Sequence, residues 1–64
     1  MNWAEFLGIM KLDEEAAQAK YKAALALATD PRVREILERL AYEEEIHVGL
    51  LEKEQERLGG VHSL

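Results

Sequence analysis

Hydrophobic residues recur along the chain at alternating steps of four and three, the spacing that places side chains on one face of an α-helix. In the first half this spacing selects a seam composed of Trp3, Leu7, Met10, Glu14, Ala17, Tyr21, Ala24 and Ala28. In the second half it selects Val33, Leu37, Leu40, Glu44, His47, Leu51, Glu54 and Leu58. The pattern predicts two long amphipathic helices whose seams pack together as in helical bundles.

Capping signals indicate where these helices begin. Asn2 is followed three residues later by Glu5, a spacing that resembles a capping box. Asp30 precedes Pro31, the one proline of the chain, and this pair is typical of a helix start. Because a residue before proline avoids the helical region, the first helix must end shortly before Asp30.

The stop signals complete the predicted boundaries. Gly59-Gly60 is typical of a helix C-terminus. We therefore predict a helix over 3–28, a tight turn at 29–30, a helix over 31–58, a hairpin domain over 1–59 and a loose tail over 60–64. Gly8 and Asp13 leave an alternative open, in which the first helix breaks and restarts with Asp13 as its cap.

The predicted fold class is all-α, an antiparallel two-helix hairpin. A chain of 64 residues buries too little surface to be very stable alone, and such small scaffolds are usually stabilised by disulfides, metals or association. The chain contains no cysteine, which excludes disulfides and thiolate metal sites. The remaining sources of stability are a metal bound by carboxylate or imidazole groups, self-association, or both.

The net charge of −5 narrows the function classes. A nucleic-acid-binding protein would show a basic patch, and a membrane-surface helix would be basic and amphipathic. No apolar run approaches the roughly 20 residues of a membrane span, and no signal peptide is visible. We therefore expect a cytoplasmic protein that binds neither nucleic acid nor membrane and that attracts cations.

Three polar residues interrupt the apolar seams: Glu14 in the first helix, and Glu44 with His47 in the second. Each lies roughly 14 to 17 residues from the turn, which corresponds to about 21–25 Å along a helix. In an antiparallel hairpin the three residues therefore occupy one level. Glu44 and His47 are three residues apart and share a helical face.

One hairpin offers too few ligands to close a metal site, and two helices cannot enclose a core. Two hairpins related by a two-fold axis would form a four-helix bundle with four glutamates and two histidines at one level. This is the arrangement of ferritin-like di-iron proteins. Carboxylates mixed with imidazole suit iron, and manganese, zinc or calcium are possible substitutes. The alternative is a non-catalytic hairpin module whose Glu–His contacts are ordinary buried hydrogen bonds.

A resemblance to a known family adds to this interpretation. Glu14-x6-Tyr21, then Thr29-Asp30-Pro31, then Glu43-Glu44-x-x-His47 resembles the encapsulated ferritins, a branch of the ferritin and rubrerythrin superfamily. The resemblance implies a ferroxidase centre at a homodimer interface, with Glu14, Glu44 and His47 as iron ligands and Tyr21 as a catalytic neighbour. It also implies a ring of dimers, commonly a decamer, that serves iron storage inside an encapsulin shell.

The sequence departs from that family in two places. Lys20 stands where the family has an aromatic residue, and the family carries a further short helix and a targeting tail after the second helix. The segment 60–64, Gly-Val-His-Ser-Leu, faintly resembles the core of encapsulin targeting peptides. A rubrerythrin-like di-iron peroxidase shares the ligand set and stays an alternative, although many rubrerythrins add a cysteine-ligated iron domain.

Other residues receive secondary interpretations. The acidic side chains of Asp13, Glu43 and Glu45 flank the predicted ligands and either guide cations or form a solvated face. Three apolar residues outside the seams, Ile46, Val48 and Leu50, predict a second interface between dimers. Trp3 and Phe6 are predicted to close the open end of a bundle.

Overall fold

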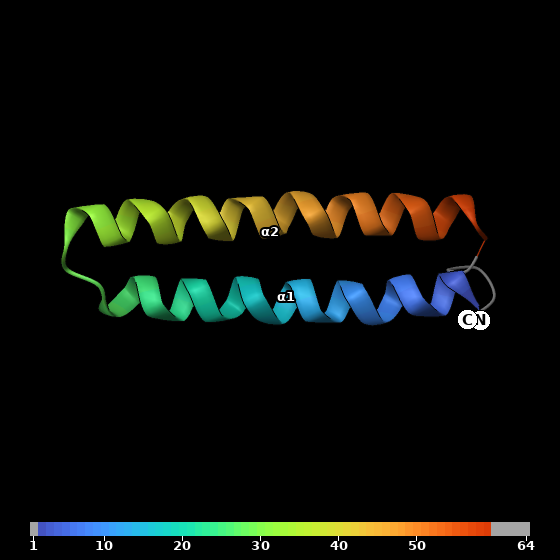
Figure 1. The fold of residues 1–64 in the computed structure, drawn as a ribbon, viewed down its shortest axis with the longest axis horizontal. Helices are drawn as coiled ribbons and strands as arrows, with labels where there is room; N and C mark the ends of the chain where they lie inside the picture. The colour runs from blue at the N-terminus through green and yellow to red at the C-terminus, as the bar shows by residue number, and fades with distance from the viewer. Residues whose placement is uncertain (1, 60–64) are drawn as a thin grey trace.

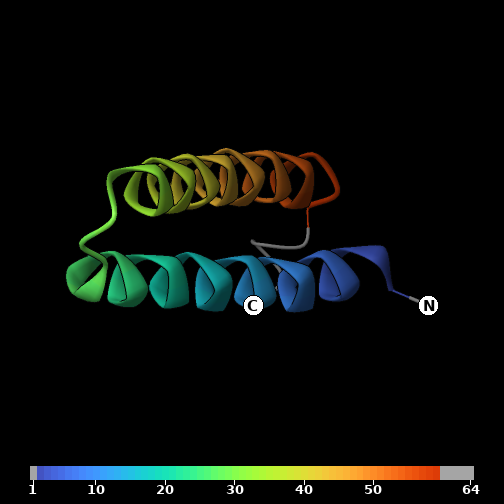
Figure 2. The same ribbon diagram turned by 60° about the vertical axis from the view of Figure 1, so that its left-hand side comes forward.

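The computed structural model describes residues 2–59, which form two helices joined by a short turn (Figure 1). Helix α1 spans Trp3–Leu27 and helix α2 spans Pro31–Arg57. The helices lie side by side and run in opposite directions (Figures 1 and 2). The predicted all-α hairpin is therefore confirmed for the described residues. The predicted tail over 60–64 lies outside them.

Side chains from the predicted capping residues begin both helices. The Asn2 side-chain oxygen accepts hydrogen bonds from the backbone N–H groups of Ala4, at 3.0 Å, and Glu5, at 3.3 Å. Asp30 Oδ1 accepts equivalent bonds from the first turn of α2, at 2.9 and 3.1 Å. These acceptors satisfy N–H groups that have no partner within a helix, so the start signals of the sequence have a local physical cause.

A cross-turn contact fixes the connection between the helices. Ala28 leaves the helical region with ψ 133°, so α1 ends one residue earlier than predicted. The Arg34 guanidinium donates from Nη1 to the carbonyl oxygens of Leu25, at 2.7 Å, and Ala28, at 2.9 Å. The basic side chain of α2 thereby satisfies carbonyl groups at the end of α1.

Helix α1 is continuous through Gly8 and Asp13, so the alternative with a break there is wrong. Gly8 has another role. The buried Gln55 side chain crosses from α2 and donates to the Ala4 carbonyl oxygen at 3.1 Å. A Cβ at Gly8 would lie 3.0 Å from Gln55 Nε2. The glycine therefore leaves room for this hydrogen bond between Gln55 and Ala4, which joins the two helices at the open end of the hairpin and which we call the Gln55 clasp.

The face of α2 that contacts α1 differs slightly from the predicted seam. Ala41 and Gln55 are the buried residues of α2, and Val48 is half-buried. Val33 and His47, predicted on the seam, are exposed. The contact stripe is thus rotated by about one position, and His47 lies at its edge. Val48 is half-buried, whereas Ile46 and Leu50 are exposed, and the predicted second interface stays a prediction.

The hairpin is a rod whose described residues form almost no buried core. Its extents are 45 × 17 × 14 Å, and Ala41 is the one apolar residue among those described that is buried, at 7% exposure. Many large apolar side chains stay exposed: Trp3, Phe6, Ile9, Leu12, Leu27, Val33, Ile36, Tyr42, Ile46, Leu50 and Leu58. Neither described helix combines the length and apolarity that a membrane crossing requires. Exposed apolar surface of this extent is typical of proteins that have an interaction surface.

Candidate metal centre

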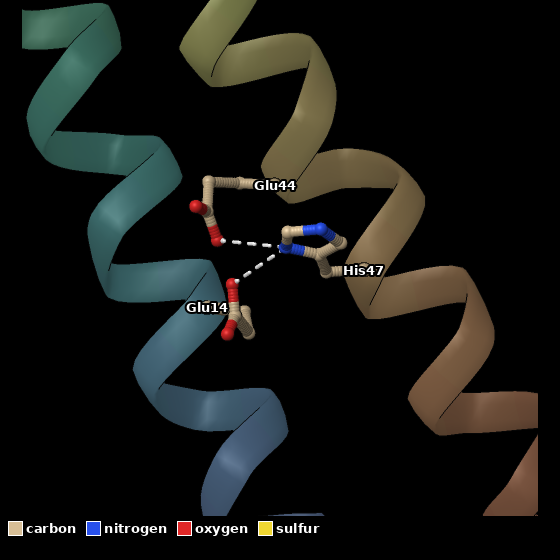
Figure 3. Close-up of polar contacts among 3 residues, drawn as sticks. All are labelled: Glu14, Glu44 and His47. Atoms are coloured by element: carbon tan, nitrogen blue, oxygen red, sulfur yellow. Dashed lines mark hydrogen bonds and ion pairs between the residues drawn. The ribbon is translucent and has the colours of Figure 1, made fainter.

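The structure brings Glu14, Glu44 and His47 together near the middle of the hairpin (Figure 3). His47 Nδ1 lies 3.3 Å from Glu14 Oε2 and 3.7 Å from Glu44 Oε2. One ligand atom from each residue lies within 4.8 Å of the other two. The predicted common level is therefore what the structure shows, and the three side chains point towards one another.

Helical geometry explains how the three side chains meet. Glu44 and His47 are one turn apart on α2, so both reach the same side of that helix. Glu44 points towards α1 and its side chain is 15% exposed, whereas the His47 side chain at the edge is 51% exposed. Glu14 faces both from α1, with 22% of its side chain exposed. The cluster is therefore covered by the hairpin on one side and open on the other.

One carboxylate oxygen of this cluster lacks a hydrogen bond from the described residues. Glu44 Oε2 is buried and has no hydrogen-bond partner among residues 2–59. A buried acceptor without a partner costs about 1–3 kcal/mol, and a charged one costs more. A cation held between Glu44 and Glu14 would satisfy this oxygen and offset the repulsion between the two carboxylates.

The donor set also fits a metal ion. Ligand atoms bonded to one ion at about 2.0–2.2 Å lie within about 4.4 Å of each other, so a small closing movement suffices. Two carboxylates and one imidazole suit iron, manganese or zinc. Calcium prefers six to eight oxygen ligands and fits this set less well. Three ligands leave positions that another group must fill.

The open side of the cluster continues into an apolar face. On α2, Ile36 and Leu50 lie at helical spacing from His47, and both are more than half exposed, at 56% and 61%. On α1, the exposed rings of Trp3 and Phe6 pack edge to face with centroids 5.6 Å apart. We call this side of the hairpin the metal face.

The opposite side of the hairpin is polar. Lys11 Nζ lies 2.9 Å from Glu52 Oε2, and this hydrogen bond with its charge raises the pKa of Lys11. The Gln55 clasp lies on the same side by helical spacing. Sequence reasoning missed these cross-helix contacts because Lys11, Glu52 and Gln55 resemble ordinary surface residues of a helix.

Tyr21 does not touch the cluster in the described contacts. It lies seven residues after Glu14, about 10 Å along the helix. No hydrogen bond among the described residues joins its hydroxyl to Glu14, Glu44 or His47, and its ring instead lies 5.9 Å from Lys20 Nζ. Its catalytic role stays a prediction.

The flanking acidic residues Asp13, Glu43 and Glu45 are exposed. Glu43 makes a loose ion pair with Arg39 at 3.9 Å, across one turn of α2. These positions agree with a solvated acidic face beside the cluster and leave the cation-guiding role a prediction.

Comparisons with known proteins give one informative relative. The chain is similar to the 3-demethoxyubiquinol 3-hydroxylase of Laribacter hongkongensis (strain HLHK9), with 41% identity over 61 residues. The similarity covers 91% of this chain and 30% of that protein, so the chain spans less than a third of its relative. No protein-family model matches the chain. No solved structure matches it.

These findings indicate a class of site, a possible metal site, and leave the particular reaction open. The chain is an all-helical hairpin, is similar to part of a hydroxylase, and carries a Glu–Glu–His cluster that could hold a metal ion. Both observations are consistent with oxidoreductase chemistry at a metal centre.

Proposed function

We propose that two copies of this chain pair through their metal faces and form a di-iron carboxylate centre that oxidises Fe(II). The observation that carries the proposal is the convergence of Glu14, Glu44 and His47 around a buried oxygen of Glu44, to which no described residue donates a hydrogen bond. A second copy would supply the same three groups. Four carboxylates and two neutral imidazoles then balance two divalent ions.

The chain's residues have distinct tasks in this proposal. Glu14 and Glu44 supply negative oxygen ligands, and His47 Nδ1 is the nitrogen that faces them. The apolar metal face excludes water around the centre when two copies meet. Two Fe(II) ions, bound as substrate, each give one electron to dioxygen, which takes up two protons and leaves as hydrogen peroxide.

The resemblance to encapsulated ferritins supports iron storage as the purpose of this oxidation. On that basis the dimers would assemble further, into a ring such as a decamer. Oxidised iron would then be stored in a cytoplasmic encapsulin compartment. A rod with extents of 45 × 17 × 14 Å is too narrow to enclose mineral, so the storage proposal requires a separate compartment.

Oxidation kinetics with matched variants test this function. We expect the wild type to oxidise Fe(II) in air much faster than buffer does, with one iron bound per chain. Glu44→Ala should lose this activity, and Glu45→Ala, an exposed neighbour of the same chemistry, should keep it. Equal oxidation rates for Glu44→Ala and the wild type would refute the ferroxidase proposal.

The hydroxylase relative favours a second candidate function. Its name states that it hydroxylates 3-demethoxyubiquinol, so the same centre could act in hydroxylation of a quinol. A demethoxyubiquinol analogue supplied with dioxygen and a reductant separates the two candidates. Turnover of the quinol to a hydroxylated product would favour the hydroxylase. Iron oxidation that is indifferent to the quinol favours the ferroxidase.

Two further alternatives have their own signatures. A rubrerythrin-like peroxidase would consume hydrogen peroxide faster than dioxygen. A non-catalytic hairpin module would tolerate His47→Ala without any change in iron content, since it binds none.

A further inference from the structure

The face of α1 turned away from α2 carries an unbroken apolar stripe. Its six positions are separated by alternating steps of three and four: Ile9, Leu12, Ala16, Ala19, Ala23 and Ala26. All six are exposed in the hairpin, Ile9 at 60% and Leu12 at 66%. We call this surface the α1 outer stripe. Such spacing is that of a coiled-coil seam, yet no part of the described chain covers it.

The sizes of the side chains indicate the direction of a partner helix. Both large residues, Ile9 and Leu12, lie in the first half of the stripe, and the second half is alanine. An antiparallel second copy of α1 would place Ile9 opposite Ala26, Leu12 opposite Ala23 and Ala16 opposite Ala19. Every layer then contains at least one alanine, and no layer contains two large side chains. The two helices can therefore pack at a similar, short distance along the whole stripe. A parallel pairing would instead place Ile9 against Ile9 and Leu12 against Leu12 at one end, and alanine against alanine at the other.

The charges beside the stripe support the same arrangement. Asp13 and Glu15 flank its first half, and Lys20 and Lys22 flank its second half. All four side chains are exposed. Antiparallel pairing brings Glu15 near Lys22 of the second copy on one side, and Asp13 near Lys20 of the second copy on the other. Each contact occurs twice because of the two-fold symmetry, which gives four complementary pairs.

The stripe is independent of the metal face. By helical spacing it lies on the side of α1 opposite to α2, whereas Glu14 faces α2 and His47. One hairpin can therefore use both surfaces at once. Two different two-fold contacts on one protomer generate an assembly larger than a dimer.

We propose that the α1 outer stripe is a self-association surface that joins two copies through antiparallel α1 helices. This surface differs from the predicted second interface of Ile46, Val48 and Leu50. In the proposal, the contact between metal-centre dimers is made by α1. Metal-face pairing and stripe pairing together would link hairpins into a closed ring or larger oligomer.

A charge-reversal cycle tests the pairing, with the dissociation constant measured on the full chain in chelator by sedimentation equilibrium. Lys22→Glu and Glu15→Lys should each weaken association roughly tenfold, because each places like charges together twice. The double variant should restore the wild-type value within about threefold. Lys53→Glu and Glu38→Lys make the same charge changes on exposed positions of α2 and should have no such effect.

Ala19→Glu provides a stronger variant that leaves the hairpin fold intact, since the position is exposed and glutamate favours helices. Circular dichroism checks the helix content. Native mass spectrometry after anaerobic Fe(II) addition should find more than two copies for the wild type and two for Ala19→Glu. A wild type that never exceeds two copies, or single reversals without effect, would overturn the stripe proposal. Iron binding and oxidation in the same samples report separately on the ferroxidase proposal.

Discussion

Glu44 is the residue whose environment is least explained by folding alone. Its Oε2 is buried, lies beside Glu14 and 3.7 Å from His47 Nδ1, and accepts no hydrogen bond within the part of the chain that the structure describes. A sequence selected only for stability would place an apolar residue here, and a functional site commonly tolerates such a local cost. The environment of Glu44 therefore favours the proposed metal centre over an ordinary contact between helices.

Replacement of Glu44 by leucine tests this directly. In chelator, Glu44→Leu should raise the free energy of unfolding by about 1–2 kcal/mol, because it removes a carboxylate whose buried Oε2 accepts no hydrogen bond from the described residues. The same variant should gain nothing from added metal. Glu45→Leu, at an exposed position, controls for the change in composition. A loss of stability in metal-free Glu44→Leu would mean that the carboxylate already has a structural partner.

At the scale of the helices, the sequence predicts most of the fold because its signals are local. Asn2 and Asp30 accept the hydrogen bonds that their positions predict, and Pro31 fixes the start of α2. The level of the cluster follows from helical rise and the position of the turn. These features depend on neighbours in the chain and need no knowledge of tertiary packing.

The rotation of α2 could not be predicted in the same way. The stripe through Leu40 and His47 and the adjacent stripe through Ala41 and Val48 are both sufficiently apolar. The structure selects the second, partly through the Gln55 clasp to Ala4, a contact between opposite ends of the chain. Choosing between adjacent stripes requires the position of the other helix, which spacing does not contain.

The cap of α2 gives a prediction at this scale. Asp30→Ala should lower the free energy of unfolding by about 1 kcal/mol, because two N–H groups of the first turn lose their acceptor. Urea denaturation monitored by circular dichroism measures the change. Thr29→Ala next to it should have a much smaller effect, and equal effects would contradict the assignment of the cap.

The ion pair between Lys11 and Glu52 predicts a dependence on alkaline pH. Its hydrogen bond raises the pKa of Lys11 above the usual 10.5. A raised folded-state pKa means that the contribution is present below pH 10.5 and is lost as the pH rises through the folded-state value. The stability of Lys11→Met should therefore fall less over this range than that of the wild type. Lys53→Met should behave like the wild type.

For the whole molecule, the proposed function requires that association and metal binding take the place of a hydrophobic core. A rod with one buried apolar residue among those described cannot be strongly stable as a monomer. Metal that binds only the paired form stabilises that form, by about 2.7 kcal/mol when its free concentration is a hundredfold above the dissociation constant. Chelation should therefore lower the melting temperature of the wild type and leave His47→Ala unchanged. A wild-type melting curve that is indifferent to chelator would exclude this coupling.

The most direct test of a shared metal centre is native mass spectrometry with metal analysis on the wild type, Glu44→Ala and Glu45→Ala after anaerobic Fe(II) addition. We predict even-numbered assemblies with one iron per chain for the wild type and Glu45→Ala, and no bound iron for Glu44→Ala. Iron-free wild type, or equal iron content in wild type and Glu44→Ala, would contradict the account.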